Sequence, residues 1–223
     1  MQATANPRVL IDVVIPRIGV ESRANRLALD AAIIVGFALF VAVCAQFSVR
    51  LPFTVVPITG QTFGVLLTGG ALGSRRGGLS MLVYMVIGMA SVPVFAPSSE
   101  FLKEKTFHLL FPWSGVSGRV WDLPSGGYIV GFVLAAFLVG LLAERGWVLR
   151  SKFPVALIIG NLAVYAVGLP WLAWKLGSDF GQTLEWGLYP FMGGDVVKLL
   201  AAALVLPGAW VLVDRLKGSR PRD

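Results

Sequence analysis

Two residues of opposite charge lie three positions apart in an otherwise apolar stretch near the C-terminal end of the chain. Asp195 and Lys198 follow a pair of glycines and precede a long run of apolar residues. In a helix, this spacing places both side chains on one face, where one can only accept hydrogen bonds and the other can only donate them. A charge at bilayer depth costs at least about 2.5 kcal/mol and therefore indicates a substrate or ion site. A self-neutralised structural ion pair is the alternative interpretation, and both stay open at this point.

Few other polar side chains lie in the apolar segments or at their ends. Asn161 and Tyr165 are four residues apart and therefore share a helix face. The remaining candidates are Thr54, Gln61, Thr62, Tyr84, Ser125 and Tyr128. Donors and acceptors in an aromatic-lined cavity are typical of a small-molecule pocket. For Thr62, Tyr84 and Ser125 we expect instead a hydrogen bond to a neighbouring backbone group.

The elements that position these side chains must be transmembrane helices. Of the 223 residues, 56% are hydrophobic and 14% are charged, whereas soluble domains carry about 25% charged residues. Six apolar segments predict an all-α membrane protein with six transmembrane helices: Leu27–Phe47, Thr59–Leu72, Gly78–Phe95, Gly126–Leu142, Pro154–Leu172 and Tyr189–Val213. The predicted organisation is an N-terminal tail (1–26), a six-helix domain (27–213) with a long external loop (92–125), and a basic C-terminal tail (214–223).

The basic residues are distributed unequally between the two sides of this arrangement. The side that holds both termini carries Arg8, Arg17, Arg23, Arg26, Arg75, Arg76, Arg145, Arg150, Lys152, Arg215, Lys217, Arg220 and Arg222, and the other side carries Arg50, Lys103, Lys105, Arg119 and Lys175. The positive-inside rule therefore places both termini in the cytoplasm, with the chain in the cytoplasmic membrane. The net charge of +7 is then a topology signal, and we expect no nucleic-acid partner.

Two segments on the outer side do not fit a simple loop. The stretch from Leu51 to Thr62 is too apolar for a solvated loop, and its two prolines resist a regular helix. Irregular backbone at membrane depth is tolerated where it lines a cavity, so this stretch is expected to form a wall or cap of a site. The aromatic-rich connection from Pro97 to Pro124 suits either a lid over the bundle or a membrane-anchored connector.

Small residues recur at four-residue spacing, which lets helices approach closely in lipid. In the fourth segment Gly127, Gly131 and Ala135 predict internal packing. In the first segment Ala28 and Ala32 lie beside the cytoplasm. For this pair, docking to another membrane protein and internal packing stay open.

The chain lacks the residues of the common intramembrane enzymes. It has one cysteine, Cys44, and one histidine, His108, which lies in the long polar loop. An intramembrane serine protease needs a buried His, and an aspartyl dyad needs a second carboxylate beside Asp195. No glycine-rich loop ending in Lys-Ser or Lys-Thr is present for binding ATP. We therefore expect neither an enzyme nor a metal or cofactor.

The ordered motifs resemble the BioY family of biotin transporters, the substrate-binding S components of energy-coupling-factor (ECF) transporters. The resemblance runs from about residue 27 to residue 205. The motifs that carry it are Pro52-Phe-Thr-Val-Val-Pro-Ile-Thr-Gly-Gln-Thr62, Leu66-Leu-Thr-Gly-Gly-Ala-Leu-Gly73, Tyr84-Met-Val-Ile-Gly-Met-Ala-Ser-Val-Pro-Val-Phe-Ala96, Ser125-Gly-Gly-Tyr-Ile-Val-Gly-Phe132, Gly160-Asn-Leu-Ala-Val-Tyr-Ala-Val-Gly168 and Pro190-Phe-Met-Gly-Gly-Asp-Val-Val-Lys198.

The resemblance implies an ECF S-component fold that binds biotin near the outer surface. The implied ligand contacts are Asp195, Lys198, Asn161, Gln61, Thr54 and Tyr165, and Tyr128 completes the predicted site. The implied partners are a transmembrane coupling subunit, which would dock at Ala28 and Ala32, and two ABC ATPases, which would hydrolyse ATP. The alternatives are an S component for another small carboxylated vitamin and a membrane sensor or assembly protein with a structural ion pair.

The orientation of biotin stays open. One hypothesis assigns the ureido ring to Asp195 and the carboxylate to Lys198. Because these side chains are close together and the two ends of biotin are far apart, both residues could instead surround one end, with the first outer loop holding the other. The chain also departs from the family pattern: Leu-Pro-Ser-Gly-Gly-Tyr128 replaces the usual Gly-Pro-Thr-Gly-Gly-Tyr, and Gly60 replaces an apolar residue.

Overall fold

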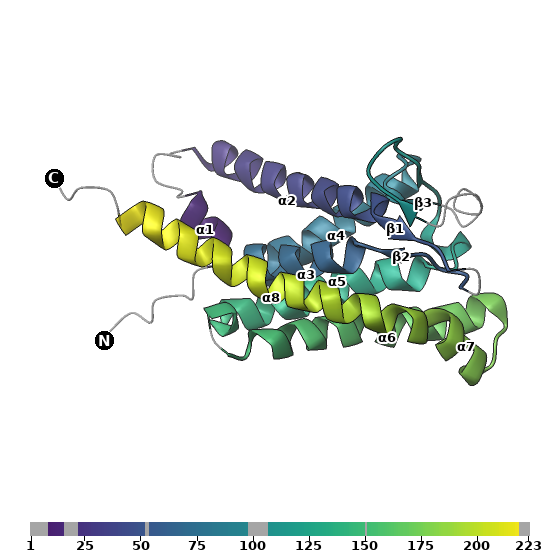
Figure 1. Cartoon of the computed structure of the whole chain (residues 1–223). Helices are drawn as coiled ribbons and strands as arrows, with labels where there is room; N and C mark the ends of the chain where they lie inside the picture. The colour runs from purple at the N-terminus through teal and green to yellow at the C-terminus, as the bar shows by residue number, and fades with distance from the viewer. Residues whose placement is uncertain (1–8, 16–21, 52–53, 98–106, 150, 219–223) are drawn as a thin grey trace.

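The computed structural model describes residues 9–15, 22–51, 54–97, 107–149 and 151–218. Within these ranges the α-helices are α1 (Leu10–Val14), α2 (Arg23–Gln46), α3 (Gln61–Leu72), α4 (Ser74–Met89), α5 (Gly126–Glu144), α6 (Phe153–Leu176), α7 (Phe180–Gly187) and α8 (Tyr189–Gly218). The long helices run side by side as a bundle (Figure 1). Helix α1 and the C-terminal end of α8 lie at one end of the bundle, and the short strands and α7 lie at the other (Figure 1).

Each of the six apolar segments overlaps one helix of this bundle. Four of these helices, α2, α5, α6 and α8, are long and apolar enough to cross a membrane among the residues that the structure describes. The third segment was expected to reach Phe95, but α4 ends at Met89, because Ser91 has a positive φ of 70° and Pro93 cannot continue a helix. Conversely, α8 continues past the expected end at residue 213 to Gly218, and α1 lies inside the expected N-terminal tail.

A glycine turn joins α3 directly to α4. Gly73 has φ +84°, a conformation that favours glycine, and its N–H closes α3 on the carbonyl of Gly69 at 2.9 Å. The next residue, Ser74, starts α4 and donates its backbone N–H to the Glu144 carboxylate of α5 at 2.7 Å. The turn therefore folds α3 and α4 into a hairpin that is fixed to the end of α5.

The packing of α5 on α6 follows the predicted small-residue stripe. A Cβ added at Gly131 would lie 3.0 Å from the Cα of Val164, and one at Gly127 would lie 2.2 Å from the Cβ of Trp171. Ala135 is completely buried. The prediction that these residues serve internal packing is confirmed, and the contact fixes α6, which carries Asn161 and Tyr165.

Short strands cover the end of the bundle that holds α7. Strand β1 (Ser48–Val49) pairs antiparallel with β2 (Ile58–Thr59) and with β4 (Phe107–His108). Strand β3 (Phe95–Pro97) pairs with β5 (Gly115–Val116). The 3₁₀ helix η2 (Val120–Asp122) leads into α5, and η3 (Trp147–Leu149) follows α5 at the opposite end. The expected external loop (92–125) therefore contributes three strands to this layer.

Candidate functional site

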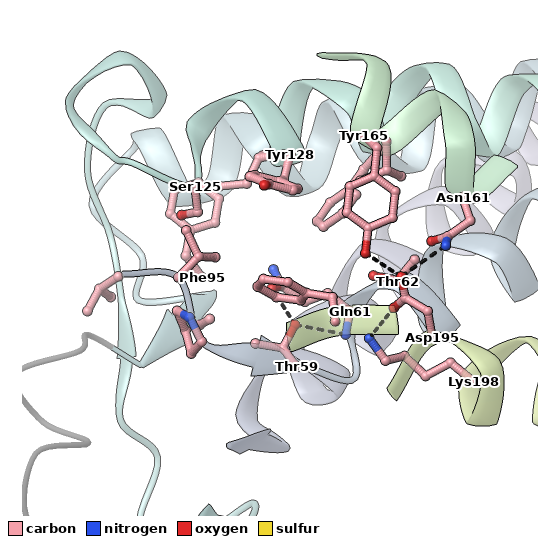
Figure 2. Close-up of a pocket in the computed structure, with 18 residues that line it drawn as sticks. Thr59, Gln61, Thr62, Phe95, Ser125, Tyr128, Asn161, Tyr165, Asp195 and Lys198 are labelled. Atoms are coloured by element: carbon pink, nitrogen blue, oxygen red, sulfur yellow. Dashed lines mark hydrogen bonds and ion pairs between the residues drawn. The ribbon is translucent and has the colours of Figure 1, made fainter. Parts of the chain in front are cut away.

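A cavity of about 60 Å³ lies between the strand layer and the helices α3, α5, α6 and α8. Its polar lining is Thr59, Gln61, Thr62, Ser125, Tyr128, Asn161, Tyr165, Asp195 and Lys198, and its apolar lining is Val56, Pro57, Phe95, Ala96, Val116, Ile129, Phe132, Val164 and Phe191. In Figure 2, Asn161, Tyr165, Asp195 and Lys198 gather at one end of this space, and Phe95 and Ser125 lie at the other. The cavity therefore has one strongly polar end and one mainly apolar end.

The carboxylate of Asp195 is the centre of the polar end. Its Oδ1 lies 2.9 Å from the Nζ of Lys198, and its Oδ2 accepts a hydrogen bond of 2.9 Å from the Nδ2 of Asn161. The hydroxyl of Tyr165 donates to the same Oδ2. Because Asp195 is only 5% exposed, these three donors stabilise a charge that would be costly to bury alone.

Two helices present these four side chains as the residue spacing predicts. On α8, Asp195 and Lys198 are one turn apart and meet in an ion pair. On α6, Asn161 and Tyr165 are one turn apart and both reach the same oxygen of Asp195. The structure therefore brings together the four residues that the sequence grouped by periodicity.

Gln61 reaches the cavity from the first residue of α3. Its Oε1 accepts a hydrogen bond from the Thr59 hydroxyl at 2.8 Å, and its Nε2 donates to the Tyr84 hydroxyl at 2.6 Å. Tyr84 in turn donates to the carbonyl of Val94 at 3.0 Å. Tyr84 thus satisfies a backbone group, as expected, and holds the Gln61 amide against the wall.

Tyr128 forms the side of the cavity beside α6. Its hydroxyl donates to the carbonyl of Gly187 at 2.9 Å, which leaves the ring facing the space. The ring stacks on Phe191 with centroids 6.3 Å apart, and it meets the ring of Tyr165 edge to face at 6.2 Å. These contacts orient an aromatic surface toward a bound molecule.

Three predicted positions differ from expectation. The structure does not bring Thr54 to the cavity, because its hydroxyl donates to the carbonyl of Leu51 at 3.2 Å. Thr62 and Ser125, for which we expected a purely structural role, both line the cavity. Ser125 stands at the mainly apolar end, beside Phe95 (Figure 2).

Sequence reasoning missed most of the apolar wall. Phe95, Ala96 and Val116 come from the connection that was expected to be either a lid or a connector, and they line the cavity directly. The signal that did point to this wall was the apolar, proline-interrupted stretch before α3, which supplies Val56 and Pro57. Which residues of the longer connection face inward depends on the β3–β5 pairing, for which the sequence offered no signal.

Ala28 and Ala32 lie apart from the cavity. Both are exposed on α2, in the half of that helix nearest its N-terminus. They are not used for packing within the described part of the chain, which leaves this face open to a partner.

The model of the BioY family matches residues 20–215. The biotin transporter BioY of Rhizobium etli is 32% identical over 80% of this chain and 87% of its own length. The probable biotin transporter BioY of Pyrococcus horikoshii is 32% identical over 86% of this chain and 98% of its own length.

A solved structure shares the fold. The crystal structure of the S component for biotin from an ECF-type ABC transporter superposes with a TM-score of 0.67 at 20% identity, covering 89% of this chain and 96% of that one. The family match spans most of the chain and includes every predicted site residue. The chain therefore belongs to the BioY family.

Proposed function

We propose that this protein is the biotin-binding subunit of an ECF-type importer and takes up biotin across the cell membrane. The relatives in Rhizobium and Pyrococcus are biotin transporters by name, and the similar fold is that of a biotin S component. The observation that carries the proposal is the ion pair of Asp195 and Lys198, which faces a small cavity instead of being sealed inside the core. A cavity lined this way suits a small ligand with both donors and acceptors.

Six helices, α2 to α6 and α8, cross the bilayer in this proposal, with both termini in the cytoplasm. The 12 residues of α3 rise only about 18 Å, against a hydrocarbon core of roughly 30 Å. The strand layer continues from α3 on the outer side and completes the crossing where it is shielded by neighbouring helices. Residues 27–213 then form the transport domain, between the cytoplasmic tails 1–26 and 214–223.

Asp195 and Lys198 both contact the ureido ring of biotin in this proposal. Their charged atoms are 2.9 Å apart, so together they offer one acceptor and one donor with no net charge. A ureido group presents N–H donors beside a carbonyl acceptor and matches this pair, with Asn161 and Tyr165 completing its surroundings. The valerate chain then extends past Gln61 and Tyr128 toward Ser125. We therefore propose the second of the two orientations, in which both residues surround one end of biotin.

Ligand entry requires movement of the wall. A cavity of about 60 Å³ holds only a few water molecules at roughly 10–15 Å³ each. Val56, Pro57, Ala96 and Val116 also line an adjacent pocket of about 150 Å³. Outward displacement of these connecting segments would join the two spaces and admit biotin from the outside.

Coupling to ATP hydrolysis would use the exposed stripe on α2. Small residues at Ala28 and Ala32 allow another helix to approach closely in lipid. We propose that the transmembrane coupling subunit docks there, and that two ABC ATPases bound to it supply the energy. The S component itself then needs no cofactor, and biotin is its ligand.

Uptake of labelled biotin tests this function. Cells without their own biotin transporter would express the chain alone or together with a coupling subunit and ATPases, and uptake would be measured in each. We expect accumulation of biotin that unlabelled biotin suppresses and other small carboxylated vitamins do not. Suppression by another small carboxylated vitamin would indicate that this vitamin is the substrate. Absence of uptake under every condition would favour a membrane assembly protein with a structural ion pair.

A further inference from the structure

A second hollow lies on the outside of the bundle, between α4, α5 and α6, and shares no residue with the biotin cavity. Its volume is about 500 Å³. Gly78 and Leu82 line it from α4, Leu134 and Phe137 from α5, and Ser74 and Arg75 stand at one end. Leu82, Leu134 and Phe137 are each about two-fifths exposed. The hollow is therefore an apolar groove with a single charged residue at its mouth.

Gly78 lines the groove without contributing a side chain. A Cβ added there would lie 3.7 Å from the Cβ of Phe137, which is an ordinary contact. One residue earlier, a Cβ at Gly77 would lie 3.0 Å from the Cα of Gly69, where two helices touch. Close helix packing thus explains Gly77, whereas Gly78 has room for a Cβ, and we expect a larger side chain there to occupy part of the groove.

Arg75 differs from its neighbour Arg76 in its partners. Arg76 bridges Asp12 at 2.7 Å and Asp30 at 3.1 Å. Arg75 is exposed and makes no ion pair with any residue in the described part of the chain. The nearby Glu144 carboxylate is bound by the N–H and hydroxyl of Ser74. The groove therefore ends at a guanidinium with no ion-pair partner among the described residues, beside a hollow that Arg75 lines together with Asp12, Asp30 and Glu144.

We propose that this groove binds one anionic phospholipid of the inner leaflet, with an acyl chain against Gly78 and Leu82 and the phosphate on Arg75. The groove mouth is at the α3–α4 turn, the end of the bundle that holds α1 (Figure 1) and that is cytoplasmic in the proposed topology. A guanidinium matches a phosphate in bidentate geometry, and basic pockets between helices on the cytoplasmic side bind anionic headgroups. From Arg75 to Leu82 the helix rises about 10 Å, so the groove holds part of one acyl chain.

Native mass spectrometry of the purified, delipidated full chain tests this site. Phosphatidylglycerol and phosphatidylcholine with identical acyl chains would be titrated separately. We expect one tightly retained phosphatidylglycerol in the unaltered protein. Arg75→Gln should weaken phosphatidylglycerol binding about fivefold, because one cation near the surface is lost. Phosphatidylcholine binding should weaken less, because the choline cation already balances the phosphate charge in that lipid.

A second set of variants tests whether the acyl chain occupies the groove. Gly78→Leu should weaken both lipids, whereas Gly208→Leu should weaken neither, because a Cβ at Gly208 meets nothing within 4 Å. Thermal unfolding and biotin binding in the same samples report on the fold and on the proposed function separately, since the groove and the biotin cavity share no residue. Arg75→Gln alters only an exposed side chain and keeps the test decisive if Gly78→Leu fails to fold.

Two results would overturn the proposal. One is that the unaltered protein retains phosphatidylglycerol and phosphatidylcholine equally and that Arg75→Gln also retains the two lipids equally. The other is unchanged lipid retention in Gly78→Leu together with loss of a copurifying membrane protein, which would assign the groove to a partner helix.

Discussion

The ammonium of Lys198 lies 2.9 Å from Oδ1 of Asp195, one helical turn away on α8. The other oxygen of Asp195 accepts from Asn161 and Tyr165. The carboxylate thus has its charge balanced on one side and its hydrogen bonds satisfied on the other. In our proposal, ligand binding and folding both depend on this pair, and mutation separates the two contributions.

Lys198→Met should destabilise the ligand-free protein, because it leaves the Asp195 carboxylate buried without its cation. Breaking a buried pair on one side costs about 3 kcal/mol. The double variant Asp195→Asn/Lys198→Met removes both charges and should recover most of that stability without recovering biotin binding. Thermal unfolding in detergent measures the difference. Equal stability of the single and double variants would show that the pair is not coupled.

Biotin and its methyl ester should lose affinity for Lys198→Met by the same factor, because Lys198 contacts the ureido end in our proposal. Calorimetric titration of both ligands into the variant and the unaltered protein gives the two ratios. Selective loss of the acid, with the ester unaffected, would instead assign Lys198 to the carboxylate of biotin.

Tyr165→Phe should weaken biotin binding by at least about tenfold, because a hydrogen bond to a charged group contributes roughly 1.5–3 kcal/mol. The substitution keeps the ring that packs against Tyr128 and removes only the hydroxyl that donates to Asp195. Tyr189→Phe is the matched control, since Tyr189 is 56% exposed. Unchanged affinity in Tyr165→Phe would exclude this hydroxyl from positioning Asp195.

Gly131→Ala should destabilise the fold by about 1–3 kcal/mol through overpacking, because its Cβ would press on the Val164 backbone at 3.0 Å. Gly36→Ala is the control, as a Cβ there meets nothing within 4 Å, and alanine favours the helix by roughly 1 kcal/mol. Unfolding midpoints of the two variants should move in opposite directions. If both midpoints shifted in the same direction by the same amount, overpacking at the α5–α6 contact would not be the cause.

Ala28→Leu combined with Ala32→Leu should preserve biotin binding and abolish copurification with the coupling subunit, because both positions are exposed and neither lines the cavity. Ala166→Leu places the same bulk on an exposed position of α6 and should leave the complex intact. A complex that survives the double substitution would place the docking surface elsewhere.

Periodicity predicted the parts of the fold and site that depend on single helices. The i, i+3 pair on α8 and the i, i+4 pair on α6 follow directly from residue spacing, and both point into one cavity. The small-residue stripe of α5 likewise predicted internal packing, and the structure shows that α6 is the helix it packs against. In each case one helix fixes the direction of the side chains before any tertiary contact forms.

The strand layer could not be predicted from the periodicity of single elements. The strand β3 at Phe95–Pro97 depends on pairing with β5, which lies about twenty residues further along the chain. Strands of two or three residues have too little alternation to identify from sequence. For the same reason the sequence suggested Thr54 as a ligand contact and did not identify Val116 as part of the wall.

Calorimetric titration of biotin into ligand-free, detergent-purified protein tests the central claim most directly, when Asp195→Asn is titrated in parallel. We predict tight binding of one biotin per chain in the unaltered protein and a loss of at least tenfold in the variant, with the folded state of both verified by thermal unfolding. Absence of biotin binding in the unaltered protein, or equal affinity in folded Asp195→Asn, would contradict the account.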